Sequence, residues 1–452
     1  MSHSHDDDTA KDPLCLIVIG VAGTGKSYLI NTLRNSLQNR CAVTATTGKA
    51  AFNIQGVTIH SLLKLPVGVY GNKDLSGESL CRLQDTLNGI EYIVIDEYSM
   101  LGQTTFGWID RRCRQATGFL DKLLGGKSLI LFGDPGQLPP VGDKPLFHSQ
   151  PSNEIGKQGY FAYMMFDKVI KLTENQRVSG VSKEQVAFRD FLFRLRNGET
   201  TSDDWQLLMT RQPSSVINIC EFENSIRLFY SNEQVGEFNY EQLTKLQSPI
   251  ACIEARHSSA GAKKLSSDEM SGLQPVIYLA KYAKVMLTMN LWPSVGLCNG
   301  ATGIVIDILY QVGHAPPSLP IAVIVKFDGY RGPSFSDQES SLVPICPVTI
   351  KASSNAFHER QQLPLRLAWA FTIHKSQGMT LSKAWVDIGK SERTVGMSYV
   401  ALSRVKTLSS LVVEPMSFER LEKIKSAATF QYRLQEQERL QRLADETATA
   451  NE

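Results

Sequence analysis

A chain of 452 residues that is 42% hydrophobic and 20% charged is expected to fold into two or more globular domains, which excludes an intrinsically disordered protein. Its net charge of +2 neither requires nor excludes a nucleic-acid partner, because acidic surface elsewhere can offset a basic channel. The eight cysteines are scattered without a Cys-x-x-Cys pair, and no apolar run is long enough to span a membrane, so we expect no zinc site, disulfide framework or membrane span.

The first predicted element is a buried strand that runs into a glycine-rich loop. Residues 14–19 are apolar and rich in Ile and Val, and Gly20-Val-Ala-Gly-Thr-Gly-Lys-Ser27 follows. Glycines let successive backbone N–H groups point at phosphate oxygens. Lys26 would place a charge at the β- and γ-phosphates, and the Ser27 hydroxyl could ligate Mg²⁺. Because a helix expected over 28–37 adds its positive dipole end, the stretch predicts a nucleoside-triphosphate site.

Three more buried strands are predicted at 41–45, 92–95 and 128–132, and polar side chains follow two of them. Asp96 and Glu97 come directly after the second of these strands, and Gln137 lies in a proline-rich turn past the third. A carboxylate there can hold the Mg²⁺ of a bound nucleotide, a neighbouring carboxylate can activate water, and an amide can contact the γ-phosphate. The simpler alternative is a pair of solvated acids at a strand end. The strand pattern itself predicts an α/β sheet with its ligand at the carboxyl edge.

The remaining chain is expected to form a second α/β unit with insertions. Residues 62–90 lose periodicity and indicate an insertion or small subdomain in the first unit, whereas Phe188, Phe191, Leu192 and Leu195 predict a helix over 186–198. The second unit begins near residue 226 and resumes at about 365–413. Short strands at 284–288, 303–310, 321–327 and 342–350 predict a small inserted β-barrel of the SH3-like type. A charged helix follows Ser417.

These patterns give the expected domain organisation. Residues 1–13 form a disordered tail, 14–212 the first lobe with its insertion at about 62–90, 213–416 the second lobe with its barrel at about 278–350, and 417–452 a charged helix and tail. A triphosphatase also needs an arginine to neutralise transition-state charge. Arg177 and Arg404 are the candidates, although an isolated arginine is more often a surface charge.

Seven segments appear in an order that resembles the motif series of a superfamily-one DNA helicase, of the PIF (petite integration frequency) type related to RecD. The resemblance covers about 14–416 and includes a helix at 188–198 similar to that family's signature helix. The segments are the glycine-rich loop, Thr44–Ala51, Thr58–Ser61, Ile95–Met100, Gly133–Val141, Thr372–Gly378 and Tyr399–Val405.

The resemblance implies two RecA-like lobes with parallel sheets, with ATP and Mg²⁺ between them and single-stranded DNA across their tops. The implied catalytic residues are Lys26, Glu97, Gln137, Arg177 and Arg404, and Ser27 and Asp96 would hold the metal. The implied nucleotide-binding residues are Gly20, Gly23, Thr24, Gly25, Lys26, Ser27, Tyr28, Gln137, Arg177, Gly378 and Arg404. In that arrangement Arg404 reaches the nucleotide from the second lobe.

Further matches imply DNA contacts through hydroxyls, backbone N–H groups and lysines, which suit phosphate binding without base readout. The residues are Thr46, Thr47, Gly48, Lys49, Thr58, His60, Thr372, His374, Lys375 and Ser376. For His60 and His374 the alternative is a satisfied core histidine. Helicases of this type also carry a glutamine-containing adenine-recognition segment upstream of the phosphate loop, and none of the 13 residues before Leu14 is glutamine.

The expected activity is ATP-dependent unwinding by a translocase that moves 5′ to 3′, a direction that rests wholly on the resemblance. The expected partners are single-stranded DNA and DNA with a 5′ tail, bound by a monomer. We expect the protein to be intracellular, in the nucleus or the mitochondrion if its source is eukaryotic. Two alternatives stay open: an ATP-switched DNA-binding module that does not unwind, and a P-loop kinase or ATPase acting on a small molecule.

Overall fold

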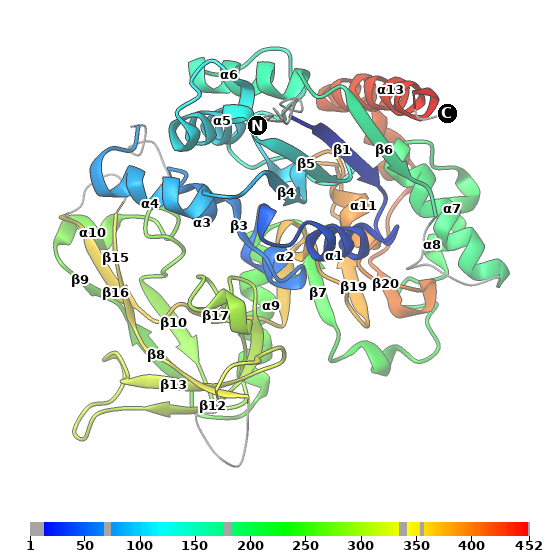
Figure 1. The fold of residues 1–452 in the computed structure, drawn as a ribbon. Helices are drawn as coiled ribbons and strands as arrows, with labels where there is room; N and C mark the ends of the chain where they lie inside the picture. The colour runs from blue at the N-terminus through cyan, green and yellow to red at the C-terminus, as the bar shows by residue number, and fades with distance from the viewer. Residues whose placement is uncertain (1–12, 67–73, 175–181, 334–340, 353–356, 451–452) are drawn as a thin grey trace.

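Two parallel β-sheets and a group of antiparallel strands make up the computed structural model, which describes residues 13–66, 74–174, 182–333, 341–352 and 357–450 (Figure 1). Residues 1–12 of the tail expected at 1–13, and the candidate Arg177, lie outside these ranges. Within the described ranges, no helix is both long and apolar enough to cross a bilayer.

The first sheet has six parallel strands in the order β3-β2-β4-β5-β1-β6. It confirms the α/β class and the strands predicted from apolar runs. Helices α1 and α2 pack on one face, and α5 and α6 pack on the other, so both faces are buried as parallel sheets require. The bounds are β1 Cys15–Gly20, α1 Lys26–Leu37, β2 Cys41–Ala45, α2 Gly48–Asn53, β3 Val57–Thr58, β4 Tyr92–Asp96, α5 Gln103–Thr117, β5 Ser128–Gly133, α6 Glu154–Met164 and β6 Lys168–Leu172.

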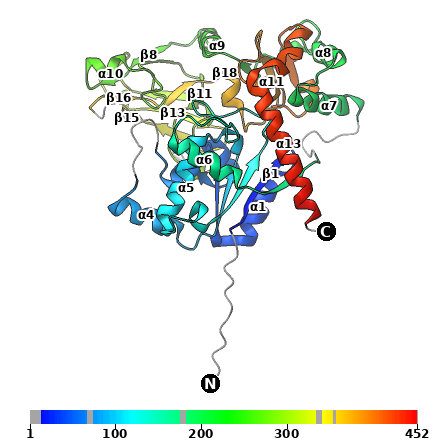
Figure 2. The same cartoon turned by 90° about the horizontal axis from the view of Figure 1, so that it is seen from above.

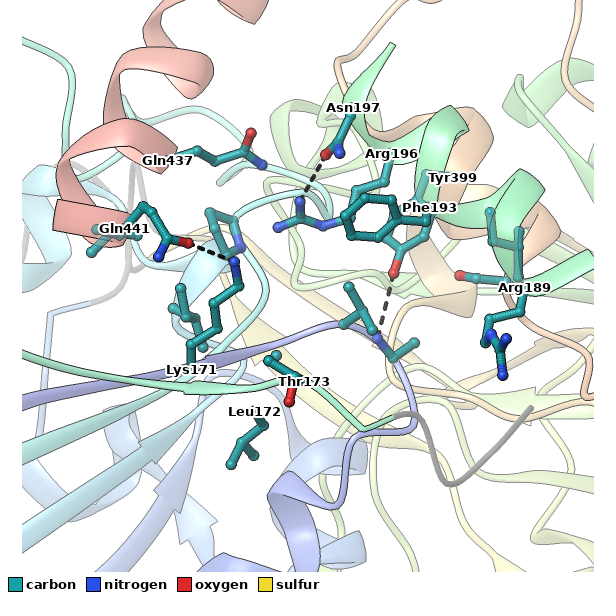
Figure 3. A pocket seen from close by; sticks show the side chains of 18 of the residues that line it. Lys171, Leu172, Thr173, Arg189, Phe193, Arg196, Asn197, Tyr399, Gln437 and Gln441 are labelled. Atoms are coloured by element: carbon teal, nitrogen blue, oxygen red, sulfur yellow. Dashed lines mark hydrogen bonds between the residues drawn. The ribbon is translucent and has the colours of Figure 1, made fainter. Parts of the chain in front are cut away.

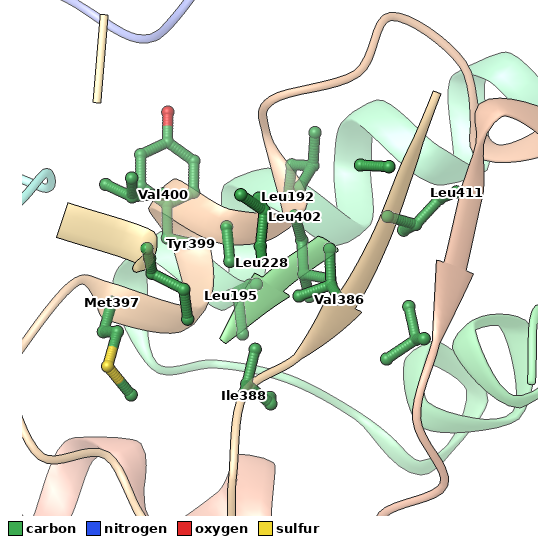
Figure 4. Packing of buried hydrophobic residues seen from close by; sticks show 14 of the residues in the cluster. Leu192, Leu195, Leu228, Val386, Ile388, Met397, Tyr399, Val400, Leu402 and Leu411 are labelled. Carbon is green, nitrogen blue, oxygen red and sulfur yellow. The ribbon is translucent and has the colours of Figure 1, made fainter. Parts of the chain in front are cut away.

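The second sheet has four parallel strands in the order β18-β7-β19-β20. Its core packs Leu228, Val386 and Leu411 from the strands against apolar residues of α7 and α11 (Figure 4). The bounds are α7 Lys183–Asn197, α8 Ser202–Met209, β7 Ile226–Phe229, α9 Asn232–Lys245, β18 Ala370–Thr372, β19 Ala384–Asp387, α11 Met397–Leu402 and β20 Leu411–Val413. Helix α7 begins three residues earlier than expected because the Ser182 hydroxyl accepts from the Gln185 N–H and caps it.

Helices α7 and α8 precede the lobe boundary expected at residue 212, yet their apolar residues lie in the core of the second sheet. Phe188, Phe191 and Leu208 are fully buried there. The division of the chain at residue 212 therefore stays a prediction, and core packing groups these two helices with the second lobe.

The segment between β7 and β18 is rich in β-strands, as expected, and these strands are antiparallel. They run from residue 251 to residue 367, a wider span than the barrel expected at about 278–350. A five-stranded sheet runs β14-β13-β12-β11-β17, a three-stranded sheet runs β15-β16-β9, and β8 pairs with β10. The pairings between described residues do not show an SH3-like closure. The single strand expected at 342–350 is divided at Pro347, and its second half joins a different sheet. The bounds are β8 Ala251–Glu254, β9 Arg256–His257, α10 Ala260–Lys264, β10 Val276–Leu279, β11 Lys284–Leu287, β12 Thr302–Leu309, β13 Ala322–Phe327, β14 Leu342–Ile345, β15 Val348–Lys351, β16 Glu359–Gln362 and β17 Leu365–Leu367.

Most of the segment expected to be irregular at 62–90 is helical where it is described. Helix α3 (Ile59–Leu63) precedes residues 67–73, which lie outside the described ranges, and α4 (Gly77–Leu87) follows them. Leu83 and Leu87 stand four residues apart on α4 and are buried in the core of the first lobe.

The charged C-terminal segment forms α12 (Phe418–Glu422) and then the long helix α13 (Ala428–Thr449), which returns to the first sheet and packs along β6 (Figure 2). The Tyr163 hydroxyl donates to Glu436 Oε1 at 2.5 Å, and Arg439 donates to Glu436 Oε2 at 2.9 Å. Leu440 is fully buried in the core of the first lobe. Helix α13 thus supplies a buried layer of that lobe.

Candidate nucleotide and nucleic-acid sites

The glycine-rich loop joins β1 to α1 and is wound around its own lysine. Gly23 and Gly25 have φ of 92° and 86°, a conformation that favours glycine. The Thr24 hydroxyl donates to the Val21 carbonyl at 3.0 Å, so this side chain braces the loop. Lys26 Nζ donates to the carbonyls of Gly20 at 2.6 Å and Val21 at 3.0 Å. These carbonyls hold the ammonium at the N-terminus of α1, where an anion would lie.

Two carboxylates at the end of β4 face this loop. Burial, and then the neighbouring charge of Glu97, raise the pKa of Asp96 to about 7, although Lys26 opposes the shift. Glu97 has φ of 56°, a left-handed conformation that costs a non-glycine residue about 1–3 kcal/mol and is concentrated at functional sites. Its Oε2 is buried without a hydrogen-bond partner among the described residues. The strain and the unsatisfied oxygen both indicate a side chain placed for a ligand.

The glycine-rich loop and the two carboxylates line a cavity of about 270 Å³, and residues of both lobes contribute to its walls. Gln137 reaches it from the first lobe, with its Oε1 buried and unpartnered among the described residues. Of the residues expected at the nucleotide, Gly20 and Thr24 are not in its lining, and Arg177 lies outside the described residues. The expected residues in the lining are Gly23, Gly25, Lys26, Ser27, Tyr28, Asp96, Glu97, Gln137, Gly378 and Arg404, and Ala22, Ala50, Asn53 and Thr380 were not expected.

Arg404 comes from the second lobe and is almost fully buried. Its Nε donates to the Val400 carbonyl at 2.6 Å, and its guanidinium also donates to the Met379 carbonyl at 3.1 Å. The arginine therefore braces the loop that carries Gly378 while lining the cavity.

A buried carboxylate that sequence reasoning did not single out, Asp134, joins four parts of the chain. It accepts from Arg196 of α7 at 2.8 Å and from the Tyr399 hydroxyl of α11 at 3.1 Å. The same hydroxyl accepts from the N–H of Ala22 in the glycine-rich loop at 3.4 Å. Burial alone would raise the pKa of Asp134, but Arg196 holds it below its usual value. The sequence motifs drew attention to neighbouring residues such as Gln137, but they did not predict the hydrogen bonds that Asp134 accepts.

The first-lobe candidates for DNA contact lie at the ends of short helices. Thr47 caps α2 and Thr58 caps α3, because each hydroxyl accepts from a backbone N–H three residues on at 3.2 Å. Thr46 donates to the Glu97 carbonyl at 3.4 Å, which ties this segment to the carboxylates. Burial lowers the pKa of His60 on α3. Gly48 and Lys49 begin α2, where a Cβ on Gly48 would lie 2.2 Å from the Asn290 side chain of the inserted strands.

The second-lobe candidates divide into two kinds. Thr372, His374 and Lys375 line a cavity of about 1040 Å³ together with Arg366. Burial and the adjacent charge of Arg366 lower the pKa of Lys375 to about 8, and burial lowers that of His374. Ser376 is not in this lining: it is fully buried, and its hydroxyl donates to the Ile373 carbonyl at 2.7 Å. The structure therefore places three of these four side chains where a ligand could reach them.

The cavity between the lobes suits a triphosphate with a divalent cation. It offers a lysine, backbone N–H groups at a helix N-terminus, and two unpartnered acceptor side chains. No group of three or more His, Cys, Asp or Glu side chains that could hold a metal occurs in the described ranges. A cation here would therefore draw on Ser27, Asp96 and the phosphates themselves, as Mg²⁺ commonly does.

The fold and this loop define a P-loop protein built from two RecA-like lobes. A family model described as PIF1-like helicase matches residues 5–206. The ATP-dependent DNA helicase Pif1 of Bdellovibrio bacteriovorus is 30% identical over 404 residues, which cover 88% of this chain and 83% of the relative. That of Campylobacter jejuni is 29% identical over 425 residues, covering 87% of each. The chain belongs to the PIF1-like helicase family.

Solved structures agree with this assignment. Pif1 helicase from Bacteroides, in complex with ADP-AlF3 and single-stranded DNA, superposes with a TM-score of 0.70 at 26% identity and 91% coverage of both chains. The chain spans only 50–58% of the length of matched relatives from Trypanosoma, Xenopus and human.

Proposed function

We propose that this chain is an ATP- and Mg²⁺-dependent DNA helicase that moves 5′ to 3′ on single-stranded DNA. The observation that carries the proposal is the cavity shared between lobes, in which Lys26 and Glu97 of the first lobe face Arg404 of the second. When a site is built from two lobes, its geometry changes as the lobes move relative to each other. Hydrolysis in such a site can therefore be coupled to movement of the lobes.

The residues divide the chemistry between them. Lys26 exchanges the Gly20 and Val21 carbonyls for phosphate oxygens, and Glu97 takes a proton from the attacking water. Ser27 and Asp96 would hold Mg²⁺, and a cation there would favour the ionised form of Asp96, whose pKa is raised by burial. Mg²⁺ neutralises charge on the phosphates when it is bound. Arg404 stabilises the transition state from the opposite lobe.

The DNA is proposed to cross both lobes. Pif1 from Bacteroides was solved bound to single-stranded DNA, and another similar Pif1 structure concerns DNA unwinding at forked double-stranded DNA, which supports this class of partner here. Thr47, Thr58 and Lys375 would contact phosphates, because hydroxyls, helix N-termini and lysines contact the backbone without reading bases. Ser376, buried and internally bonded, would shape the loop rather than touch DNA.

Turnover with and without single-stranded DNA tests the proposal. We expect DNA to stimulate hydrolysis, and we expect Glu97→Gln and Lys26→Ala to lower turnover about 100-fold or more, the scale of a lost general base, while DNA binding persists. Glu91→Gln is the matched control, because Glu91 is an exposed carboxylate of the same lobe. Wild-type turnover in either site variant would refute the site. Hydrolysis indifferent to DNA would favour the small-molecule ATPase.

A further inference from the structure

The turn that carries Gln137 is held on both sides of one peptide group. The Gln137 N–H donates to the Asp134 main-chain carbonyl at 3.0 Å, and the Gly136 N–H donates to the Asp134 carboxylate at 2.9 Å. The Gly136 carbonyl, which belongs to the same peptide group as the Gln137 N–H, accepts from Arg433 of α13 at 3.3 Å. Gln137 Oε1 is buried without a partner among the described residues, so the backbone of this turn sets where the amide lies in the cavity of about 270 Å³.

Arg433 joins this turn to the second lobe. Only 4% of its surface is exposed, and its guanidinium also donates to the Arg196 carbonyl at the C-terminal end of α7. The same guanidinium lies 4.3 Å from the centre of the Phe430 ring, which is part of the core of the second lobe. Burying a guanidinium costs free energy, and here its hydrogen bonds go to main-chain carbonyls of two segments far apart in the chain. Arg433 therefore fixes the backbone of both segments.

A second residue of α13 supports the same turn. Gln437 stands four residues after Arg433, on the same face of the helix. Its amide oxygen, turned toward Arg196, accepts from that guanidinium at 2.9 Å, and Figure 3 shows Gln437 of α13 beside Arg196 of α7. Arg196 in turn donates to the Asp134 carboxylate at 2.8 Å. Helix α13 thus holds the turn directly through Arg433 and indirectly through Arg196 and Asp134.

The second lobe also contacts this peptide group directly. Gly396 precedes α11 with φ of 89°, a conformation that favours glycine. A Cβ at this position would lie 2.7 Å from the Gly136 oxygen and 2.8 Å from the Gln137 oxygen, so a side chain does not fit there. A movement between the lobes would therefore act on the peptide group that Arg433 holds.

We propose that Arg433 is a positioning residue for ATP hydrolysis: by holding the Gly136 carbonyl, it keeps the Gln137 amide directed at the terminal phosphate while the lobes move. The inference rests on the proposed ATP site and adds to it a residue of the C-terminal helix. Helix α13 then contributes to the rate of hydrolysis as well as to the stability of the first lobe.

Steady-state hydrolysis in the presence of single-stranded DNA tests the positioning role. Arg433→Met should lower kcat about tenfold and leave KM for ATP within about twofold, because the nucleotide still binds and only the orientation of Gln137 is lost. Arg439→Met is the matched control, since Arg439 holds the same helix in place through Glu436. It should lower the unfolding temperature and, below that temperature, retain wild-type kcat. Wild-type kcat in Arg433→Met, or an equal loss in Arg439→Met, would overturn the proposal.

Arg433→Lys provides a milder change should the methionine variant not fold. A lysine keeps the charge but presents a compact ammonium in place of the planar guanidinium that bonds two carbonyls. Its kcat should fall about threefold, again with little change in KM. Wild-type kcat in the lysine variant would also overturn the proposal, because the turn would then not depend on the paired hydrogen bonds.

A double variant separates action through Gln137 from a general effect on the fold. If Arg433 acts through Gln137, the variant carrying both Gln137→Ala and Arg433→Met should hydrolyse ATP within about twofold of Gln137→Ala alone, because the effects of residues that act as one unit do not add. Losses that multiply would overturn the positioning role, and so would wild-type turnover in Gln137→Ala. Absence of DNA-stimulated hydrolysis in the wild-type chain would instead refute the proposed function.

Discussion

Lys375 is the residue whose charge state is most open to a direct test. Its pKa, lowered to about 8 by burial and by Arg366, means that the ammonium loses its proton as the pH rises through about 8. If it contacts DNA phosphate, affinity for single-stranded DNA should fall about three- to fourfold between pH 7 and pH 9, somewhat less than the roughly fivefold of a whole screened ion pair of about 1 kcal/mol, because the titration is incomplete at both ends. Fluorescence anisotropy of labelled DNA without nucleotide measures this.

The matched control is Lys375→Arg, which keeps its charge at both pH values and should lose most of the pH dependence. An equal fall in the arginine variant would place the titrating group elsewhere.

The glycine-rich loop and the strand ends are local features of the sequence, and they predicted Lys26, Ser27, Asp96, Glu97 and Gln137 in the lining of the 270 Å³ cavity. Gly378 was expected only from the family resemblance. The sequence did not reveal that the Ser376 hydroxyl donates to the Ile373 carbonyl. Nor did it reveal that Asp134 accepts from Arg196 and Tyr399, because those contacts depend on how distant segments pack. Asn53 and Thr380 border the cavity for the same reason and carry no sequence signal of their own.

At the scale of elements, the buried parallel strands were predictable because each is a short apolar run with polar residues after it. The helix α4 was missed because its segment is rich in glycine, although Leu83 and Leu87 give it a buried stripe. The strand expected at 342–350 was divided because Pro347 lacks the N–H that a continuing ladder needs.

The docking of α13 is the element-level feature with the clearest energetic consequence. Glu436 is buried and bonds both Tyr163 and Arg439. Glu436→Ala should destabilise the protein by about 3 kcal/mol because it leaves the arginine and the hydroxyl without their partner. Thermal unfolding measures the loss. Glu438→Ala, at an exposed site on the same helix, should change stability by less than about 0.5 kcal/mol. Equal effects of the two changes would show that the buried contacts are not what holds α13.

At the scale of the whole molecule, the two lobes meet through specific side chains. The Tyr399 hydroxyl of the second lobe bonds Ala22 and Asp134 of the first, and Gln377 donates to Ser99 at 3.4 Å. Ala22 lines the cavity of about 270 Å³, and so does Gly378, the neighbour of Gln377 in the chain. An occupant of that cavity would therefore alter the interface between the lobes. We therefore expect this interface to connect nucleotide chemistry to movement along DNA.

Strand separation itself is the most direct test of that connection. The assay compares two duplexes that differ only in carrying a 5′ or a 3′ single-stranded tail. Each is mixed with the protein and ATP in a stopped-flow unwinding assay. Binding alone does not separate the strands, so the comparison measures the direction of movement. We predict that the 5′-tailed duplex is unwound, that the 3′-tailed duplex is not, and that Lys26→Ala unwinds neither. Unwinding from the 3′ tail, or DNA-stimulated hydrolysis with no unwinding of either duplex, would contradict the proposed coupling.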